Sequence, residues 1–177
     1  MTFASSYLAS ALFEFKRYKN YGDVVFDQLT EEDFFWQRSP QDNSIAIIVK
    51  HMSGNMQSRW TNFLKEDGEK SWRERDQEFT APPKTSKEVI VLWENGWNSL
   101  FQALDQLTEN NLDAEITIRG EKHSIPQAIN RQLAHYASHV GQIVFIGKTL
   151  KKLEWKSPTI PKGGSKDFNK KMFGENS

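Results

Sequence analysis

The chain has 177 residues, and 23 Lys and Arg side chains balance 23 Asp and Glu side chains, so its formal net charge is +0. Hydrophobic residues make up 37% of the sequence, including 12 Phe and 6 Trp, which is enough for one packed domain and excludes wholesale disorder. The absence of cysteine excludes disulfides, thiolate zinc sites and a cysteine nucleophile. With no dense basic cluster outside the last residues, nothing points to a nucleic-acid partner.

The first predicted element is an amphipathic helix over about residues 3–29, where apolar side chains recur every three or four positions. Its start has no positively charged region and carries Glu14 and Lys16 early, so it does not read as a signal peptide. The longest apolar run, Ile45 to Val49, is far too short to span a bilayer. We therefore expect no membrane partner and a cytoplasmic location.

A second helix is predicted over about residues 44–65, with Asn43 or Ser44 as its N-cap. The charged segment 65–84 follows, has no sustained period, and is expected to be a long surface loop of the kind that often carries function. Its stretch SWRERDQEF would either cover a site or pack as an ordered connector. The density of opposite charges favours the connector.

The third predicted helix begins at the capping box formed by Thr85 and Glu88 and runs to about residue 107. On this helix, Trp93, Trp97 and Phe101 recur at steps of four, which favours a core or dimer surface over a substrate box. Apolar and polar residues then alternate on either side of Arg119-Gly120, which predicts a short β-hairpin.

A fourth helix is predicted from a second capping box, Ser124 and Gln127, to about residue 152. Four long helices, one hairpin and one long loop indicate an all-α protein, an up-down-type four-helix bundle over residues 1–153. The rest, 154–177, is rich in Gly, Pro and Lys and is expected to be an irregular tail, docked by Trp155 and Phe173.

Two of the four histidines, His135 and His139, lie four positions apart on the fourth predicted helix, so both imidazoles can face one point. His51 flanks the apolar stripe of the second helix and is the best third member, whereas His123 lies in the hairpin and is a poorer one. Three such nitrogens form a metal site with open positions. The alternative is that these histidines are structural and only form hydrogen bonds.

Polar residues on the same helical faces are candidates for substrate binding. Asn55 and Arg59 follow His51 by four and eight positions, and Arg131 precedes His135 by four. An arginine beside a metal cavity can hold a carboxylate through two parallel hydrogen bonds. Alternatively, these side chains orient the histidines or bond between helices. The pattern assigns no catalytic residue.

The stretches KHMSGNMQSRW at 50–60 and HYASH at 135–139 resemble the DinB/YfiT-like family in sequence and position, over about residues 3–153. The longer run from Ser53 to Phe79 is similar to one uncharacterised branch of that family. The resemblance implies a four-helix bundle in which His51, His135 and His139 bind a divalent metal, most often zinc or nickel. Characterised relatives include S-transferases and isomerases that use low-molecular-weight thiols such as bacillithiol or mycothiol, and several are homodimers.

From the resemblance we expect a metal-binding homodimer that transfers a low-molecular-weight thiol to small electrophiles. Two alternatives stay open. One is a non-catalytic, metal-stabilised dimeric stress or binding protein, and the other is a metal-dependent hydrolase. Nitrogen ligands alone do not identify the metal, because zinc, nickel, copper and iron all accept them.

Overall fold

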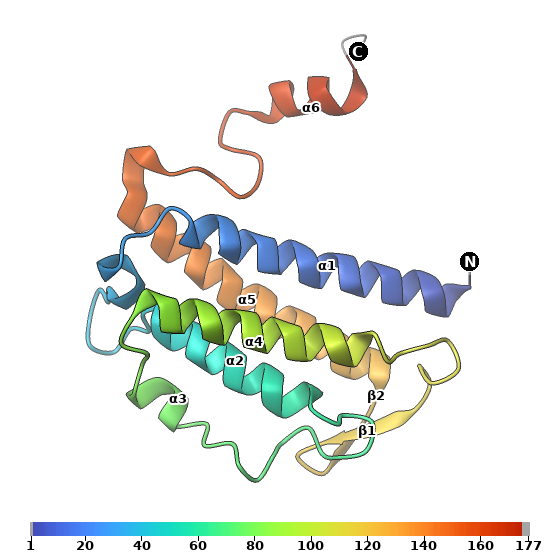
Figure 1. Ribbon diagram of the computed structural model, residues 1–177. Helices are drawn as coiled ribbons and strands as arrows, with labels where there is room; N and C mark the ends of the chain where they lie inside the picture. Colours follow the sequence, from blue (N-terminus) through green and yellow to red (C-terminus); the bar gives the residue numbers. More distant parts are fainter. Residues whose placement is uncertain (1, 175–177) are drawn as a thin grey trace.

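Helices dominate the computed structural model, which describes residues 2–174 (Figure 1). Within that range the α-helices are α1 (Phe3–Phe26), α2 (Ile45–Trp60), α3 (Gln77–Thr80), α4 (Ser86–Leu104), α5 (Ile125–Lys151) and α6 (Ser165–Phe173). Short 3-10 helices span Glu32–Phe35 and Lys152–Glu154, and the strands are β1 (Glu115–Ile118) and β2 (Glu121–Ser124). The predicted long helices and hairpin are therefore confirmed in kind and order.

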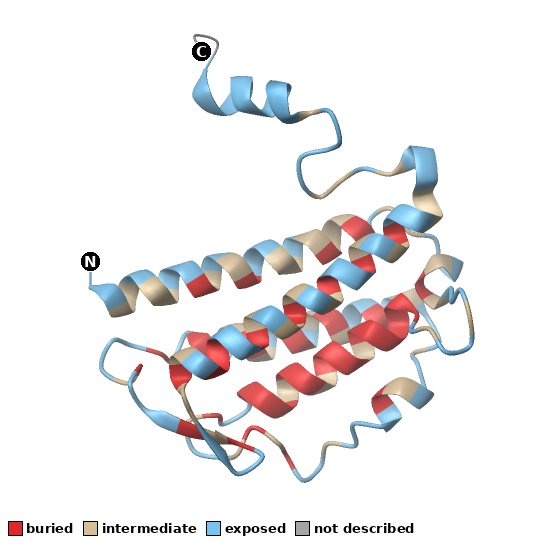
Figure 2. Ribbon diagram, turned by 180° about the vertical axis from the view of Figure 1, so that it is seen from behind, coloured by how far each residue is buried: buried red, intermediate tan, exposed pale blue. Residues whose placement is uncertain are grey.

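The four long helices pack in pairs (Figure 1), and their buried apolar side chains form one hydrophobic core. Helix α2 lies against α4, α1 lies against α5, and α2 also contacts α5. Most of α2 is buried, which is visible as the red helix in Figure 2. Trp93 and Trp97 of α4 are 2% and 0% exposed, so of the two predicted locations, core or dimer surface, they occupy the core.

Capping explains where two of the helices begin. At α5, the Ser124 hydroxyl accepts from the backbone N–H of Gln127 and the Gln127 side chain accepts from the Ser124 N–H, which completes the predicted capping box. At α4, Thr85 accepts from the N–H of Glu88, but the Glu88 carboxylate bonds the N–H of Lys84 instead. Only half of that predicted box forms.

The first three predicted helices extend three to five residues beyond their observed ends, whereas the fourth ends within one residue of its prediction. Helix α2 ends at Trp60 rather than near 65, because Asn62 adopts a left-handed backbone with φ of 49°. This early end lets the following chain turn back along α2. The long loop predicted for 65–84 therefore starts at residue 61 and contains the short helix α3.

The hairpin is tied to this loop. Arg119 and Gly120 both have positive φ, 56° and 75°, as a two-residue type I′ turn requires. The Asp67 carboxylate accepts from the backbone N–H groups of both turn residues at 2.8 Å. The Gly68 N–H donates to the Thr117 carbonyl at 2.8 Å. Loop and hairpin therefore form one connected wall at this end of the helices.

The tail differs from its prediction. Residues Ser165–Phe173 form α6 rather than an irregular segment, since this stretch contains no Gly or Pro and has lysines in its last turn. Trp155 packs against α5 at Gly147, as predicted, but Phe173 is 72% exposed and does not dock. In the described part of the chain, no helix combines the length and hydrophobicity needed to cross a membrane.

Candidate metal centre

The three predicted histidines meet at one point between α2 and α5. The Nε2 atom of His135 lies 3.3 Å from Nε2 of His51 and 3.0 Å from Nε2 of His139. Ligand atoms of all three lie within 4.8 Å of one another. Metal–nitrogen bonds of about 2.0–2.1 Å in a tetrahedral arrangement separate neighbouring nitrogens by about 3.3–3.4 Å. The two separations that involve His135 are therefore close to those of a metal-ligand set.

Hydrogen bonds on the far side of two rings direct their lone pairs inward. Nδ1 of His51 lies 2.8 Å from Oε2 of Glu78, a carboxylate oxygen that only accepts, so Nδ1 carries the proton. Nδ1 of His139 likewise bonds the Gln142 side-chain oxygen at 2.9 Å. Nε2 of each ring is then an acceptor. The single ring N–H of His135 can donate to only one of these two Nε2 atoms. A cation, in contrast, accepts a lone pair from each of the three rings, so the three nitrogens fit a divalent metal.

Burial favours the neutral histidines that metals bind. Burial lowers the pKa of His135 to about 3, and the neighbouring His139, His51, Arg73 and Arg59 add electrostatic repulsion against its protonated form. Burial also lowers the pKa of His139, against the opposing effect of the hydrogen bond that its Nδ1–H donates to Gln142. Both rings are therefore uncharged at neutral pH.

A buried ion pair behind His51 fixes the orientation of its ring. Arg73 donates two hydrogen bonds to the Glu78 carboxylate, Nε to Oε1 at 2.8 Å and Nη2 to Oε2 at 3.0 Å. Burial raises the pKa of Glu78, but the bonds from His51 and Arg73 outweigh it, so the net shift is downward. A Cβ at Gly54 would lie 2.4 Å from Oε1 of Glu78, so only glycine leaves this carboxylate room.

The predicted substrate-binding residues are brought together. Asn55, Arg59 and Arg131 line one pocket of about 240 Å³ with His51 and His135. We call it the arginine pocket. Asn55 also accepts a hydrogen bond from the Tyr136 hydroxyl at 3.0 Å, which fits the alternative that it joins two helices.

Several pocket residues were missed in the sequence. Arg73, Arg75, Arg119 and Gln132 also line the arginine pocket, and Glu78 stands behind His51. The predicted connector is confirmed as an ordered, ion-paired segment, and it also forms one wall of the pocket. The only signal in the sequence was the density of charge in SWRERDQEF.

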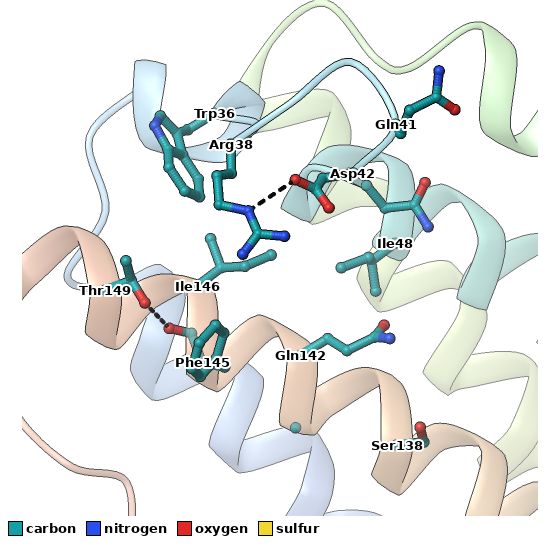
Figure 3. A pocket seen from close by; sticks show the side chains of 12 residues that line it. Trp36, Arg38, Gln41, Asp42, Ile48, Ser138, Gln142, Phe145, Ile146 and Thr149 are labelled. Atoms are coloured by element: carbon teal, nitrogen blue, oxygen red, sulfur yellow. Dashed lines mark hydrogen bonds and ion pairs between the residues drawn. The ribbon is translucent and has the colours of Figure 1, made fainter.

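A second cavity, drawn in Figure 3, lies further along α5 than the arginine pocket. This cleft of about 600 Å³ is lined partly by Trp36, Ile48, Phe145 and Ile146, and we call it the apolar cleft. Arg38 and Asp42 form an ion pair at 3.3 Å beside it. Gln142 both lines this cleft and bonds His139, so the histidines stand between the two cavities.

These features define a mostly helical protein with a three-histidine cluster in which His51 is buried and His135 and His139 are half-buried. The family model described as "Protein of unknown function (DUF1572)" matches residues 2–164, and the chain belongs to this family. The match contains all three histidines and stops before α6. Comparison with curated proteins and comparison with solved structures gave no match.

Proposed function

We propose that the four long helices form a bundle of the DinB/YfiT type and that His51, His135 and His139 bind one divalent cation, zinc or nickel. The convergence of their Nε2 atoms, with separations of 3.3 and 3.0 Å, is the observation that carries this proposal. The carboxylate of Glu78 supports it, because metal-binding histidines commonly donate their other N–H to such a group.

The reaction that this site supports best is transfer of a low-molecular-weight thiol to a small electrophile. A cation held by three neutral nitrogens lowers the pKa of a thiol or water beside it, which supplies a nucleophile near neutral pH. The sulfur attacks the electrophilic carbon, a C–S bond forms, the bond to the leaving group breaks with its electron pair, and the thiol proton passes to solvent.

The protein's own groups would hold the reactants on opposite sides of the centre. The apolar cleft (Figure 3) offers Ile48, Phe145 and Ile146 to an uncharged electrophile, and its lining residue Gln142 bonds His139. The arginine pocket offers charge and hydrogen bonds next to His51 and His135. An arrangement with one apolar and one cationic side suits two unlike reactants better than hydrolysis of a single substrate.

The metal content of the purified chain tests the first part. We expect about one divalent metal per chain by elemental mass spectrometry, lost when His51, His135 and His139 are all changed to Ala. The matched control is His123→Ala, since His123 lies outside the cluster. Absence of metal from the wild type, even after reconstitution with zinc and nickel, would contradict the proposal.

A metal-loaded chain is then assayed for loss of thiol in the presence of alkyl and epoxide electrophiles. Metal-dependent thiol consumption supports the transferase. Cleavage of ester or amide substrates without thiol indicates a hydrolase, and bound metal that raises Tm with no turnover indicates a metal-stabilised binding protein.

We further propose a homodimer, on the resemblance to the DinB/YfiT-like family. Light scattering coupled to gel filtration should give twice the 20.5 kDa of one chain. A mass of one chain at micromolar concentration would contradict it.

A further inference from the structure

The arginine pocket has an unusual concentration of positive charge. Among the described residues, its lining contains five arginines from four parts of the chain: Arg59 of α2, Arg73 and Arg75 of the connector, Arg119 of the hairpin turn and Arg131 of α5. At about 240 Å³, it is smaller than the roughly 300–1,000 Å³ of sites for drug-sized ligands. A small molecule therefore fits it.

The acidic groups nearby do not balance these arginines. A single oxygen of Glu69, Oε2, accepts from Arg59 at 2.8 Å, Arg119 at 3.2 Å and Arg73 at 3.4 Å. The other buried carboxylate, Glu78, is already shared between Arg73 and a histidine. The guanidinium groups of Arg59, Arg73 and Arg119 therefore share only two carboxylates as charged hydrogen-bond acceptors.

The two remaining arginines have weaker partners. Arg131 contacts the ring nitrogen Nε2 of His123 at 3.2 Å, and Arg75 reaches the exposed Asp76 at 3.6 Å and lies over the Phe79 ring, 5.2 Å from its centroid. Both arginines are exposed at the rim of the pocket. Their guanidinium groups are free to turn toward a ligand without breaking a buried ion pair.

Two buried polar atoms of the pocket residues lack partners. Within the described residues, the Arg59 Nε–H donates no hydrogen bond and the Gln132 side-chain oxygen accepts none, although both residues are buried. Buried donors and acceptors are nearly always satisfied, so two unsatisfied atoms on residues that line the same pocket point to a polar partner outside the chain. This partner would offer an acceptor to Arg59 and a hydroxyl or N–H donor to Gln132.

We propose that the arginine pocket binds a compact molecule with two or more anionic groups, carboxylate or phosphate, and at least one hydrogen-bond donor. Arg59 binds its inner end, and Arg75, Arg119 and Arg131 close over its outer end through charge-assisted bonds. The identity of this molecule rests on the proposed function: it is the acidic portion of the thiol cosubstrate. The sulfur of that cosubstrate then lies beside His51 and His135.

The test measures anion binding without any metal. Full-length protein, stripped of metal by chelation and dialysis, is titrated calorimetrically with citrate, malate and inorganic phosphate at constant ionic strength. The diamide of malate is the uncharged control ligand. We expect binding of at least one anion and none of the diamide, and the stronger of the carboxylate and phosphate titrations identifies the anionic group.

Variants at the rim assign the binding to this pocket without disturbing buried charges. Arg131→Gln and Arg75→Gln should each weaken anion binding by about tenfold. Arg38→Gln is the matched control, because Arg38 is 79% exposed and lines the apolar cleft. It should change the affinity by less than about twofold, the scale of a screened surface charge.

Three results would overturn the inference: no binding of any of the three anions, equal binding of the diamide, or unchanged affinity in Arg131→Gln. Because these titrations use metal-free protein, the two proposals fail separately. Anion binding in a chain that never takes up metal would leave this inference standing and remove the metal-dependent function.

Discussion

Nδ1 of His51 and Oε2 of Glu78 lie 2.8 Å apart, although 27 positions separate them in the sequence. The bond joins α2 to the connector, and the Phe79 ring packs against the same imidazole, tilted by 32°, with ring centroids 4.8 Å apart. The connector is therefore part of the histidine centre. Its charges orient one ring before any ligand arrives.

Glu78→Gln should weaken metal binding while leaving the three histidines in place. The amide can no longer be a purely accepting, charged partner for His51, and loss of such partners typically costs about 10–100-fold in metal affinity. Competition titrations with a zinc chelator measure the change. The visible spectrum of the Co²⁺-loaded variant should also change, which a purely structural role would not cause.

The same substitution leaves the buried Arg73 with only Glu69, at 3.4 Å, so unfolding free energy should fall by about 1–3 kcal/mol. Glu74→Gln is the control, since Glu74 is exposed on the same segment. An affinity for zinc equal to that of the wild type would show that Glu78 has no part in the metal centre.

Gly54→Ala should act on the same carboxylate from the other side. The added methyl group would lie 2.4 Å from Oε1 of Glu78. The two hydrogen bonds from Arg73 hold the carboxylate in place, so it cannot move away without breaking them. We expect metal affinity to fall by about tenfold, as for other displaced ligand partners.

Gly141→Ala on α5 is the matched control, since no neighbouring atom lies within 4 Å of the point where the added methyl group would stand. There the better helix propensity of Ala should raise stability by about 0.5–1 kcal/mol with no loss of metal. Equal metal affinity in the two alanine variants would contradict the assigned role of Gly54.

Asp67→Asn should change how the stability of the fold depends on pH in the acidic range. Burial raises the pKa of Asp67, but the backbone hydrogen bonds from Gly120, Glu69 and Arg119 together outweigh it and lower the pKa to about 2, from an ordinary 3.8. A carboxyl with a depressed pKa stabilises the fold fully above its unfolded value, and this contribution is lost as pH falls from about 4 to about 2.

Thermal unfolding at a series of pH values measures this effect. The variant should melt below the wild type at pH 5 to 7, and the difference should shrink toward pH 2. Asp113→Asn, at an exposed site, should follow the wild type throughout. A constant difference between wild type and Asp67→Asn at every pH would rule out the charge as its cause.

Ending the chain after Gly164 should leave the fold and the centre intact. None of the residues of α6 is buried, and the family match ends at residue 164. We expect Tm within about 2 °C of the full chain, the change typical of surface substitutions, and unchanged metal content. A clear loss of Tm or a change in oligomeric mass would assign α6 a packing role.

The helices and the histidine cluster were accessible from sequence because both depend on helical periodicity. His135 and His139 share a face wherever α5 packs, and capping residues mark the starts of α4 and α5. The ends of helices were less accessible, since a single left-handed residue, Asn62, decides where α2 stops.

The remaining parts of the site come from the connector and the hairpin turn, where apolar residues do not recur at helical spacing. Glu78 and Arg73 reach His51 only because the connector turns back along α2, and Arg119 faces the pocket because Asp67 holds the hairpin turn. These orientations depend on tertiary contacts between distant segments. No spacing rule in the sequence encodes them.

The 84 positions between His51 and His135 give the centre a further consequence for the folding of the chain. A cation bound to both rings would cross-link the polypeptide and close a loop that includes the connector, α4 and the hairpin. Such a clip restricts the unfolded ensemble more as the loop lengthens. Metal would then slow the separation of α2 from α5 most of all, and α1, outside the closed loop, would be the first long helix free to detach.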